Sequence, residues 1–166
     1  PEPELESEFV ASGILASGSG SGDYTIKLWD MSDLAASDSS GEAWKTLANH
    51  TNSVYALAYN AQGTRLASGD WDGNIRIWDA SDSSYGEVIN FSEVSAGASD
   101  GWYTKIAKLA YFFDDTKLAS VGGGEGSKWI SIWDATDNAD SNQAPVKVSV
   151  SNPPSGFTSL AIHPKG

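Results

Sequence analysis

The 166-residue sequence contains no cysteine, which excludes disulfides and thiolate metal ligands. Positive charge is scarce, because ten Lys and Arg stand against 22 Asp and Glu and the formal net charge is −12. An acidic surface repels phosphate backbones, so nucleic acid is not an expected partner. No apolar run approaches the roughly 20 residues of a membrane-spanning helix, so no membrane partner is expected either. Residues 1–13 begin PEPELESEF, lack the basic and apolar regions of a secretory signal, and are predicted to be an acidic leader, with no compartment indicated.

Seven tryptophans are present, and three of them close a repeated motif. Trp29, Trp78 and Trp133 end the alternating runs YTIKLWD, NIRIWD and KWISIWD, and each run follows a short segment that ends in LAS. Alternation of apolar and polar residues indicates half-buried strands, and the Gly and Asp between the two segments indicate a hairpin turn. Helical periodicity is absent from the sequence. We therefore predict an all-β fold built from units of four short strands.

These segments resemble the repeats of the WD-repeat β-propeller family over roughly residues 14–166. In that family each blade is a four-stranded sheet, with strands a to d running from the axis of the ring to its rim. The resemblance implies strands b, c and d of blade one in 14–48, blade two in 49–91 and blade three in 92–150. Blade one lacks strand a, whereas 151–166 contains SLAIHPKG, which aligns with ALAYNAQG of blade two. This last segment is predicted to be a strand a that is donated to blade one of another chain.

Three blades alone would form a ring too tightly curved for neighbouring sheets to pack at about 10 Å. An unpaired apolar strand edge on each copy instead favours association of identical chains around a rotation axis. Two copies would supply six blades, which lies within the usual range of four to eight blades, and three copies would supply nine. A homodimer is therefore the favoured assembly, and a homotrimer is the alternative.

The resemblance also implies a buried hydrogen-bonded network in each blade, formed by a His before strand a, a Ser on b, an Asp in the b–c turn and the Trp on c. Blade two has the full set: His50, Ser68, Asp72 and Trp78. Blade one supplies three of the four: Ser17, Asp23 and Trp29. Blade three supplies Ser120 and Trp133, and Ser127 stands where the Asp is expected. Because a buried network stabilises only when each member has a partner, blade two is predicted to be the most stable.

A Ser, a His and an Asp in one blade also suggest a hydrolase triad. Ser68 is expected inside a sheet rather than on a strained turn, so the structural interpretation is favoured. His163 precedes a Pro at a strand end and is interpreted as a turn residue. The sequence shows neither a nucleophile–base pair nor a metal-ligand cluster, so no enzymatic activity, no metal and no cofactor are predicted.

Aromatic residues in loops are the candidate binding residues. Trp71 lies in a predicted b–c turn, and Trp102 and Tyr103 end the loop before a strand a; in a propeller both kinds of loop lie on the same face. The family binds peptides and proteins there, and aromatic anchors on a rigid rim suit such recognition. The leading interpretation is a non-catalytic scaffold that binds itself and an unknown peptide or protein. The alternative is a small-ligand or carbohydrate-binding propeller module, although Tyr24, Trp71 and Trp129 do not stand in register from blade to blade.

Overall fold

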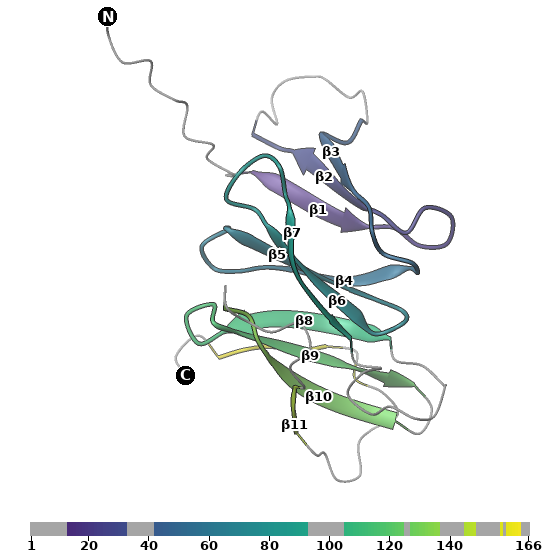
Figure 1. Ribbon diagram of the computed structural model, residues 1–166, viewed down its shortest axis with the longest axis vertical. Coiled ribbons are helices and arrows are strands. Elements are labelled where there is room, and N and C mark those ends of the chain that lie inside the picture. The colour runs from purple at the N-terminus through teal and green to yellow at the C-terminus, as the bar shows by residue number, and fades with distance from the viewer. Residues whose placement is uncertain are drawn as a thin grey trace, which may run out of the picture.

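The described part of the chain consists of β-strands joined by turns and loops (Figure 1). A computed structural model describes residues 13–32, 42–92, 105–124, 127–136, 145–148, 157 and 159–163. The predicted acidic leader, apart from Gly13, and the aromatic pair Trp102 and Tyr103 lie outside these residues. Within the described ranges, no helix is long and apolar enough to cross a membrane.

The strands form three antiparallel sheets, and within each sheet the strands follow one another in chain order. Sheet 1 contains β1 (Ile14–Gly18), β2 (Ile26–Asp30) and β3 (Lys45–Leu47). Sheet 2 contains β4 (Val54–Tyr59), β5 (Arg65–Asp70), β6 (Asn74–Asp79) and β7 (Glu87–Ser92). Sheet 3 contains β8 (Ile106–Phe112), β9 (Lys117–Gly124), β10 (Ser127–Asp134) and β11 (Val146–Val148). The predicted all-β fold is confirmed.

The three sheets are stacked, with sheet 2 between sheets 1 and 3 (Figure 1). Successive side chains of a strand point to opposite faces, so each strand of sheet 2 supplies two cores. Leu66 and Trp78 pack with Ile26 and Leu28 of sheet 1. The opposite face of sheet 2 packs against sheet 3. The core between these two sheets includes Ala67, Ile75, Ile77, Ile106 and Leu118. Each described sheet is thus held by apolar contacts with the next one.

Two glycines allow these sheets to approach closely. Gly18 ends β1, and a Cβ atom there would lie 2.7 Å from the backbone oxygen of Val54 on β4. Gly69 holds the same place in β5, and a Cβ atom there would collide with the Ile106 side chain on β8. Atoms in real structures do not approach to such distances, so any larger residue would push the neighbouring inner strand away.

The inner strands β4 and β8 pair with the LAS strands in one shared register. Leu57 lies opposite Ser68 in sheet 2, and Leu109 lies opposite Ser120 in sheet 3. Each inner strand also has a bulge near its start, between Val54 and Ala56 in β4 and at the equivalent place in β8. A bulge re-aims the extra side chain, and Tyr55 is accordingly 48% exposed on the inner strand.

The described residues of the predicted donated strand belong to no sheet of the single chain. Phe157 and residues 159–163 belong to no described strand. Ile162 and His163 instead line a cavity of about 640 Å³ together with residues 61–62 in a turn of sheet 2 and residues 111–115 at the end of β8 and in the turn that follows. Pairing of this segment with another copy stays a prediction.

Candidate functional site

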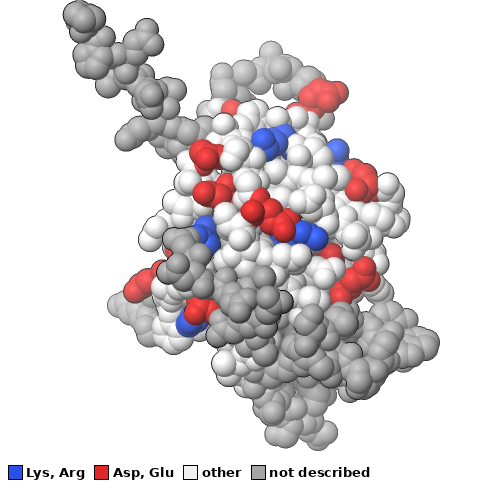
Figure 2. Space-filling view, in the orientation of Figure 1, with Lys and Arg blue, Asp and Glu red and all other residues white. Residues whose placement is uncertain are grey.

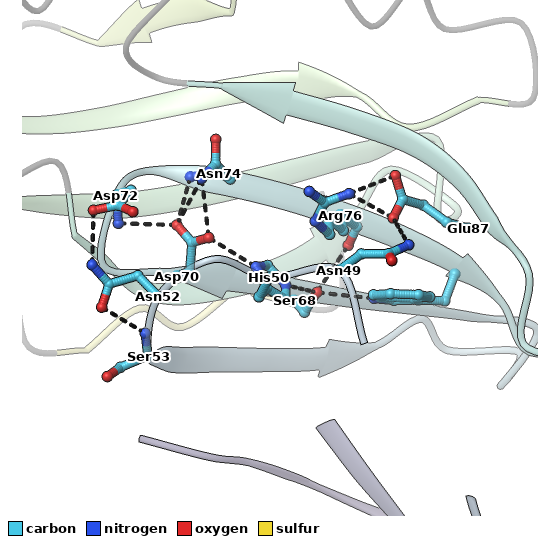
Figure 3. Close-up of polar contacts among 11 residues, drawn as sticks. Asn49, His50, Asn52, Ser53, Ser68, Asp70, Asp72, Asn74, Arg76 and Glu87 are labelled. Carbon is cyan, nitrogen blue, oxygen red and sulfur yellow. Dashed lines mark hydrogen bonds and ion pairs between the residues drawn. The ribbon is translucent and has the colours of Figure 1, made fainter. Parts of the chain in front are cut away.

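A chain of buried hydrogen bonds crosses sheet 2. Trp78 on β6 donates from Nε1 to Ser68 Oγ on β5 at 2.9 Å. His50, in the loop before β4, contacts Ser68 Oγ through Nε2 at 2.7 Å and Asp70 Oδ2 through Nδ1 at 2.8 Å. Figure 3 shows the His50 ring between Ser68 and Asp70. The network therefore joins two strands to the loop that leads into the inner strand.

The predicted carboxylate of this network was wrong: His50 contacts Asp70, not Asp72. Ser68 and Asp70 are two residues apart on one strand, so their side chains share a face and reach the same imidazole. Asp72 lies in the following turn, where its Oδ1 accepts a hydrogen bond from Asn52 at 2.9 Å. Period-two spacing from Ser68 is the sequence signal that could have identified Asp70.

Asp70 is buried as an anion that its partners stabilise. Burial opposes its ionisation, but hydrogen bonds from His50 and Asn74 outweigh burial and lower the pKa of the carboxyl group below its ordinary value. Asp70 Oδ1 also accepts hydrogen bonds from the backbone N–H groups of Asp72 and Asn74, at 3.0 and 2.9 Å. An ionised Asp70 is only an acceptor, so His50 Nδ1 must carry a proton in this arrangement.

Ser68, His50 and Asp70 have the connectivity of a hydrolase triad, but all three are buried among the described residues. Ser68 and Asp70 are 0% exposed, and none of the three lines a described cavity. Ser68 Oγ is also held by the Trp78 indole, and a triad requires a nucleophile that faces the substrate. The geometry thus suits a structural role. Within the described ranges, no group of three His, Asp or Glu side chains could hold a metal ion.

The equivalent Trp–Ser pairs of the other sheets are formed as well. Trp29 donates to Ser17 at 2.9 Å, and Trp133 donates to Ser120 at 2.8 Å. The structure does not bring Asp23 to the first pair: Asp23 accepts a hydrogen bond from the backbone N–H of Thr25 at 3.1 Å. The side chain of Ser127 lies outside the described part of the chain.

Sheet 1 presents an apolar face that no described sheet covers. Leu15 is 56% exposed, whereas Leu66 and Leu118, at the same position of the other two LAS strands, are 0% exposed. Those two leucines are buried because the preceding sheet in the stack packs on them. Trp29 pairs with Leu15 across the strands and is only partly buried, for the same reason.

A second cluster lies where sheets 2 and 3 meet. The rings of Tyr55 and Trp71 are 5.5 Å apart, and Lys105 Nζ lies 4.5 Å from the Tyr55 ring centre and 5.6 Å from that of Trp71. The predicted binding residue Trp71 is therefore partly buried by neighbours rather than fully exposed. Sequence reasoning missed Tyr55 and Lys105, because only the bulge in β4 and the packing of two sheets bring them to Trp71.

Acidic side chains predominate on the face shown in Figure 2, outside the residues drawn in grey. Several basic side chains are paired with them, as in Arg76–Glu87 at 2.6 Å and Lys117–Asp134 at 3.2 Å. The full chain carries a net charge of −12, which disfavours attraction of a polyanion.

Comparison with known proteins identifies the repeat. Residues 41–79 match the family model described as "WD domain, G-beta repeat". The WD repeat-containing protein slp1 of Schizosaccharomyces pombe is 31% identical over 97 residues, which are 58% of this chain and 18% of that protein. The Coronin-like protein of Saccharomyces cerevisiae is 28% identical over 127 residues, 76% of this chain and 17% of that protein.

Solved structures show the same fold. A chain in the "Crystal Structure of Mitotic Checkpoint Complex" superposes with a TM-score of 0.57 at 21% identity, covering 82% of this chain and 35% of that chain. This chain therefore spans about a third of that structure and less than a fifth of either curated relative.

Proposed function

Because this chain is a WD-repeat protein, we propose that it is a non-catalytic scaffold for protein interaction whose ring of blades is completed by another copy through strand exchange. Its WD-repeat relatives support the scaffold role, and its three sheets would be the three predicted blades. One observation carries the self-association: the face of sheet 1 that bears Leu15 and Trp29 is open, although its equivalents in sheets 2 and 3 are buried.

An open apolar sheet face of this kind requires a partner that packs on it. A second copy can supply that partner, because the equivalent faces in this chain are each covered by another sheet of the same type. If each copy covers the open face of sheet 1 on the other copy, the two copies form a closed two-fold assembly of six sheets. Three copies give nine sheets, which lies outside the usual number of blades.

The mass in solution tests the self-association. We expect a species of about 35 kDa, twice the 17.5 kDa of one chain, by light scattering after size exclusion. Leu15→Glu should shift the mass to that of one chain, because a carboxylate on the contact face would have to be desolvated. Val88→Glu is the matched control, since Val88 is 48% exposed on β7, and it should leave the mass unchanged. A folded wild-type protein of single-chain mass would contradict the assembly.

We place the recognition surface at Tyr55, Trp71 and Lys105. Two aromatic rings and an ammonium group on rigid strand ends are suited to anchoring a peptide. The bulge in β4 keeps Tyr55 exposed, and the adjacent turn holds Trp71 against it. A partner would therefore meet a preformed surface and lose little affinity to ordering of the protein.

Selection from a displayed peptide library tests this surface without knowledge of the natural partner. Peptides enriched on the wild-type protein are expected to lose about tenfold or more in affinity for Trp71→Ala, as is typical when an aromatic anchor is removed. Trp44→Ala is the control, because Trp44 is 40% exposed in the bend before β3, away from this surface, and its loss should leave the affinity unchanged. Peptides that bind both variants as well as the wild type would rule out Trp71 as an anchor.

A further inference from the structure

We propose that the open edge of β1 and the groove beside it form a receptor for residues 157–163 of a second copy, which bind as an antiparallel strand in one fixed register. This inference rests on the proposed self-association and specifies the contact that joins the two copies. It identifies the partner segment, the edge that receives it and the residues that face each other.

The edge of β1 lacks a strand that its equivalents possess. β5 pairs with β4 on one side and β6 on the other, and β9 pairs likewise with β8 and β10. Among the described residues, β1 pairs with β2 alone. A strand edge with unpaired N–H and C=O groups is a template for pairing with another chain.

An apolar groove of about 160 Å³ runs along this edge. Its walls are Ile14, Leu15 and Ala16 of β1 and, from sheet 2, chiefly Leu57 and Tyr59. Leu57 is only partly buried, whereas Leu109, its equivalent in sheet 3, is 7% exposed beneath the inner strand of sheet 2. A strand added to β1 would cover Leu57 in the same way, so the groove fits an inner strand.

Residues 157–163 have the sequence of an inner strand, but the described residues among them belong to no sheet. Their sequence FTSLAIH parallels VYALAYN at 54–60 and IAKLAYF at 106–112. In the single chain Ser159, Ala161 and Ile162 are exposed and unpaired with any described strand. Addition of a strand to an exposed sheet edge supplies main-chain hydrogen bonds and buries alternate side chains, which is what these residues lack.

The occupant comes from a second copy because of the order of the sheets. Ile162 and His163 line a cavity with residues 111–115, at the end of β8 and in the turn after it, and with residues 61–62 of sheet 2. Figure 1 shows sheet 2 between this segment and β1. Pairing within one chain would therefore require the segment to cross to the far side of sheet 2, whereas a neighbouring copy can present it directly.

The two complete sheets define the register. Ala58 lies opposite Ala67 in sheet 2, and Ala110 lies opposite Ala119 in sheet 3. The same pairing places Ala161 of one copy opposite Ala16 of the other. It also places Leu160 opposite Ser17 and Ile162 opposite Leu15. A shift by one residue would turn Leu160 from one face of the sheet to the other, so the register is strongly specified.

Cysteine cross-linking between copies tests the register directly, because the chain has no cysteine of its own. We would mix full-length Ala16→Cys and Ala161→Cys proteins, oxidise them and read a non-reducing gel. Directly opposed residues fall within the Cα spacing that a disulfide needs, so most of the protein should migrate at the mass of two chains. Ala16→Cys mixed with Ser159→Cys is the control, since a two-residue offset exceeds that spacing and should reduce the yield about tenfold.

The outcomes separate this inference from the proposed function. Equal yields from the two mixtures, or an intrachain disulfide in the double variant Ala16→Cys/Ala161→Cys, would overturn the exchanged strand. A mass of two chains without cross-linking would overturn strand exchange, here and in the proposed function, and leave only the association of two copies, whereas single-chain mass would overturn the association as well. If Ala16→Cys or Ala161→Cys fails to fold, Leu15→Cys mixed with Ile162→Cys provides a second pair of opposed residues for the same test.

Discussion

Replacement of Trp78 by alanine is expected to lower the free energy of unfolding by about 4 kcal/mol. Trp78 is 3% exposed and packs in the core between sheets 1 and 2. Its removal would leave a cavity there and would also deprive Ser68 Oγ of the indole N–H at 2.9 Å. The measurement is equilibrium unfolding in urea at pH 7, at one protein concentration because association adds to the apparent stability.

Trp44→Ala is the matched control for Trp78→Ala. Trp44 is the same residue type but is 40% exposed, and its ring meets Tyr85 edge-on at 6.0 Å. Its loss should cost clearly less than the loss of Trp78, because a larger part of its surface is already in contact with water. Equal losses for the two variants would contradict the larger contribution assigned to the buried Trp78.

Asp70→Ala is expected to cost about 3 kcal/mol, whereas Asp72→Ala should cost about 1 kcal/mol or less. Removal of Asp70 leaves the buried His50 Nδ1 and the N–H groups of the following turn without their acceptor. Asp72 loses one hydrogen bond from Asn52 at a partly buried site. Urea unfolding of both variants gives the comparison, and a larger loss for Asp72→Ala would contradict the assignment of the network to Asp70.

The pH dependence provides a second measurement of the Asp70 effect. Because the pKa of Asp70 is lowered in the folded protein, the unfolded chain binds more protons than the folded one near the ordinary value of 3.8. The contribution of Asp70 is therefore present above that pH and is lost as the pH falls through the folded pKa. The stability gap between the wild type and Asp70→Asn should narrow on acidification below pH 4. A gap that stays constant would show that ionised Asp70 is not the stabilising species.

The strand order was predictable because its signals are local. Each LAS segment and its Trp lie within one hairpin, and the structure places Leu66 opposite Trp78 and Leu118 opposite Trp133. The hydrophobic period of two fixes which residues face the core, so register follows once one face is buried. The Trp–Ser pairs were predicted from the resemblance to the WD-repeat family, and this register brings the two side chains within hydrogen-bond distance.

The remaining features depend on how sheets pack on one another. Asp72 was chosen from the family pattern, and the direction of the His50 side chain decides in favour of Asp70. Tyr55 meets Trp71 because of a bulge, and Lys105 reaches both from the next sheet. Residue spacing along one chain does not encode such approaches between sheets, and these contacts required coordinates.

The close contacts at Gly18 and Gly69 bear on the outline of any larger assembly. At the corresponding place in β9 the chain has Val121, a buried residue with two methyl groups. A blade packed on the far side of sheet 3 could not approach β9 at Val121 as closely as the neighbouring sheets approach one another at Gly18 and Gly69. In a closed dimer, the contact at Val121 between the two copies would be wider than the two contacts at Gly18 and Gly69 within each copy. The ring would therefore be oval rather than circular.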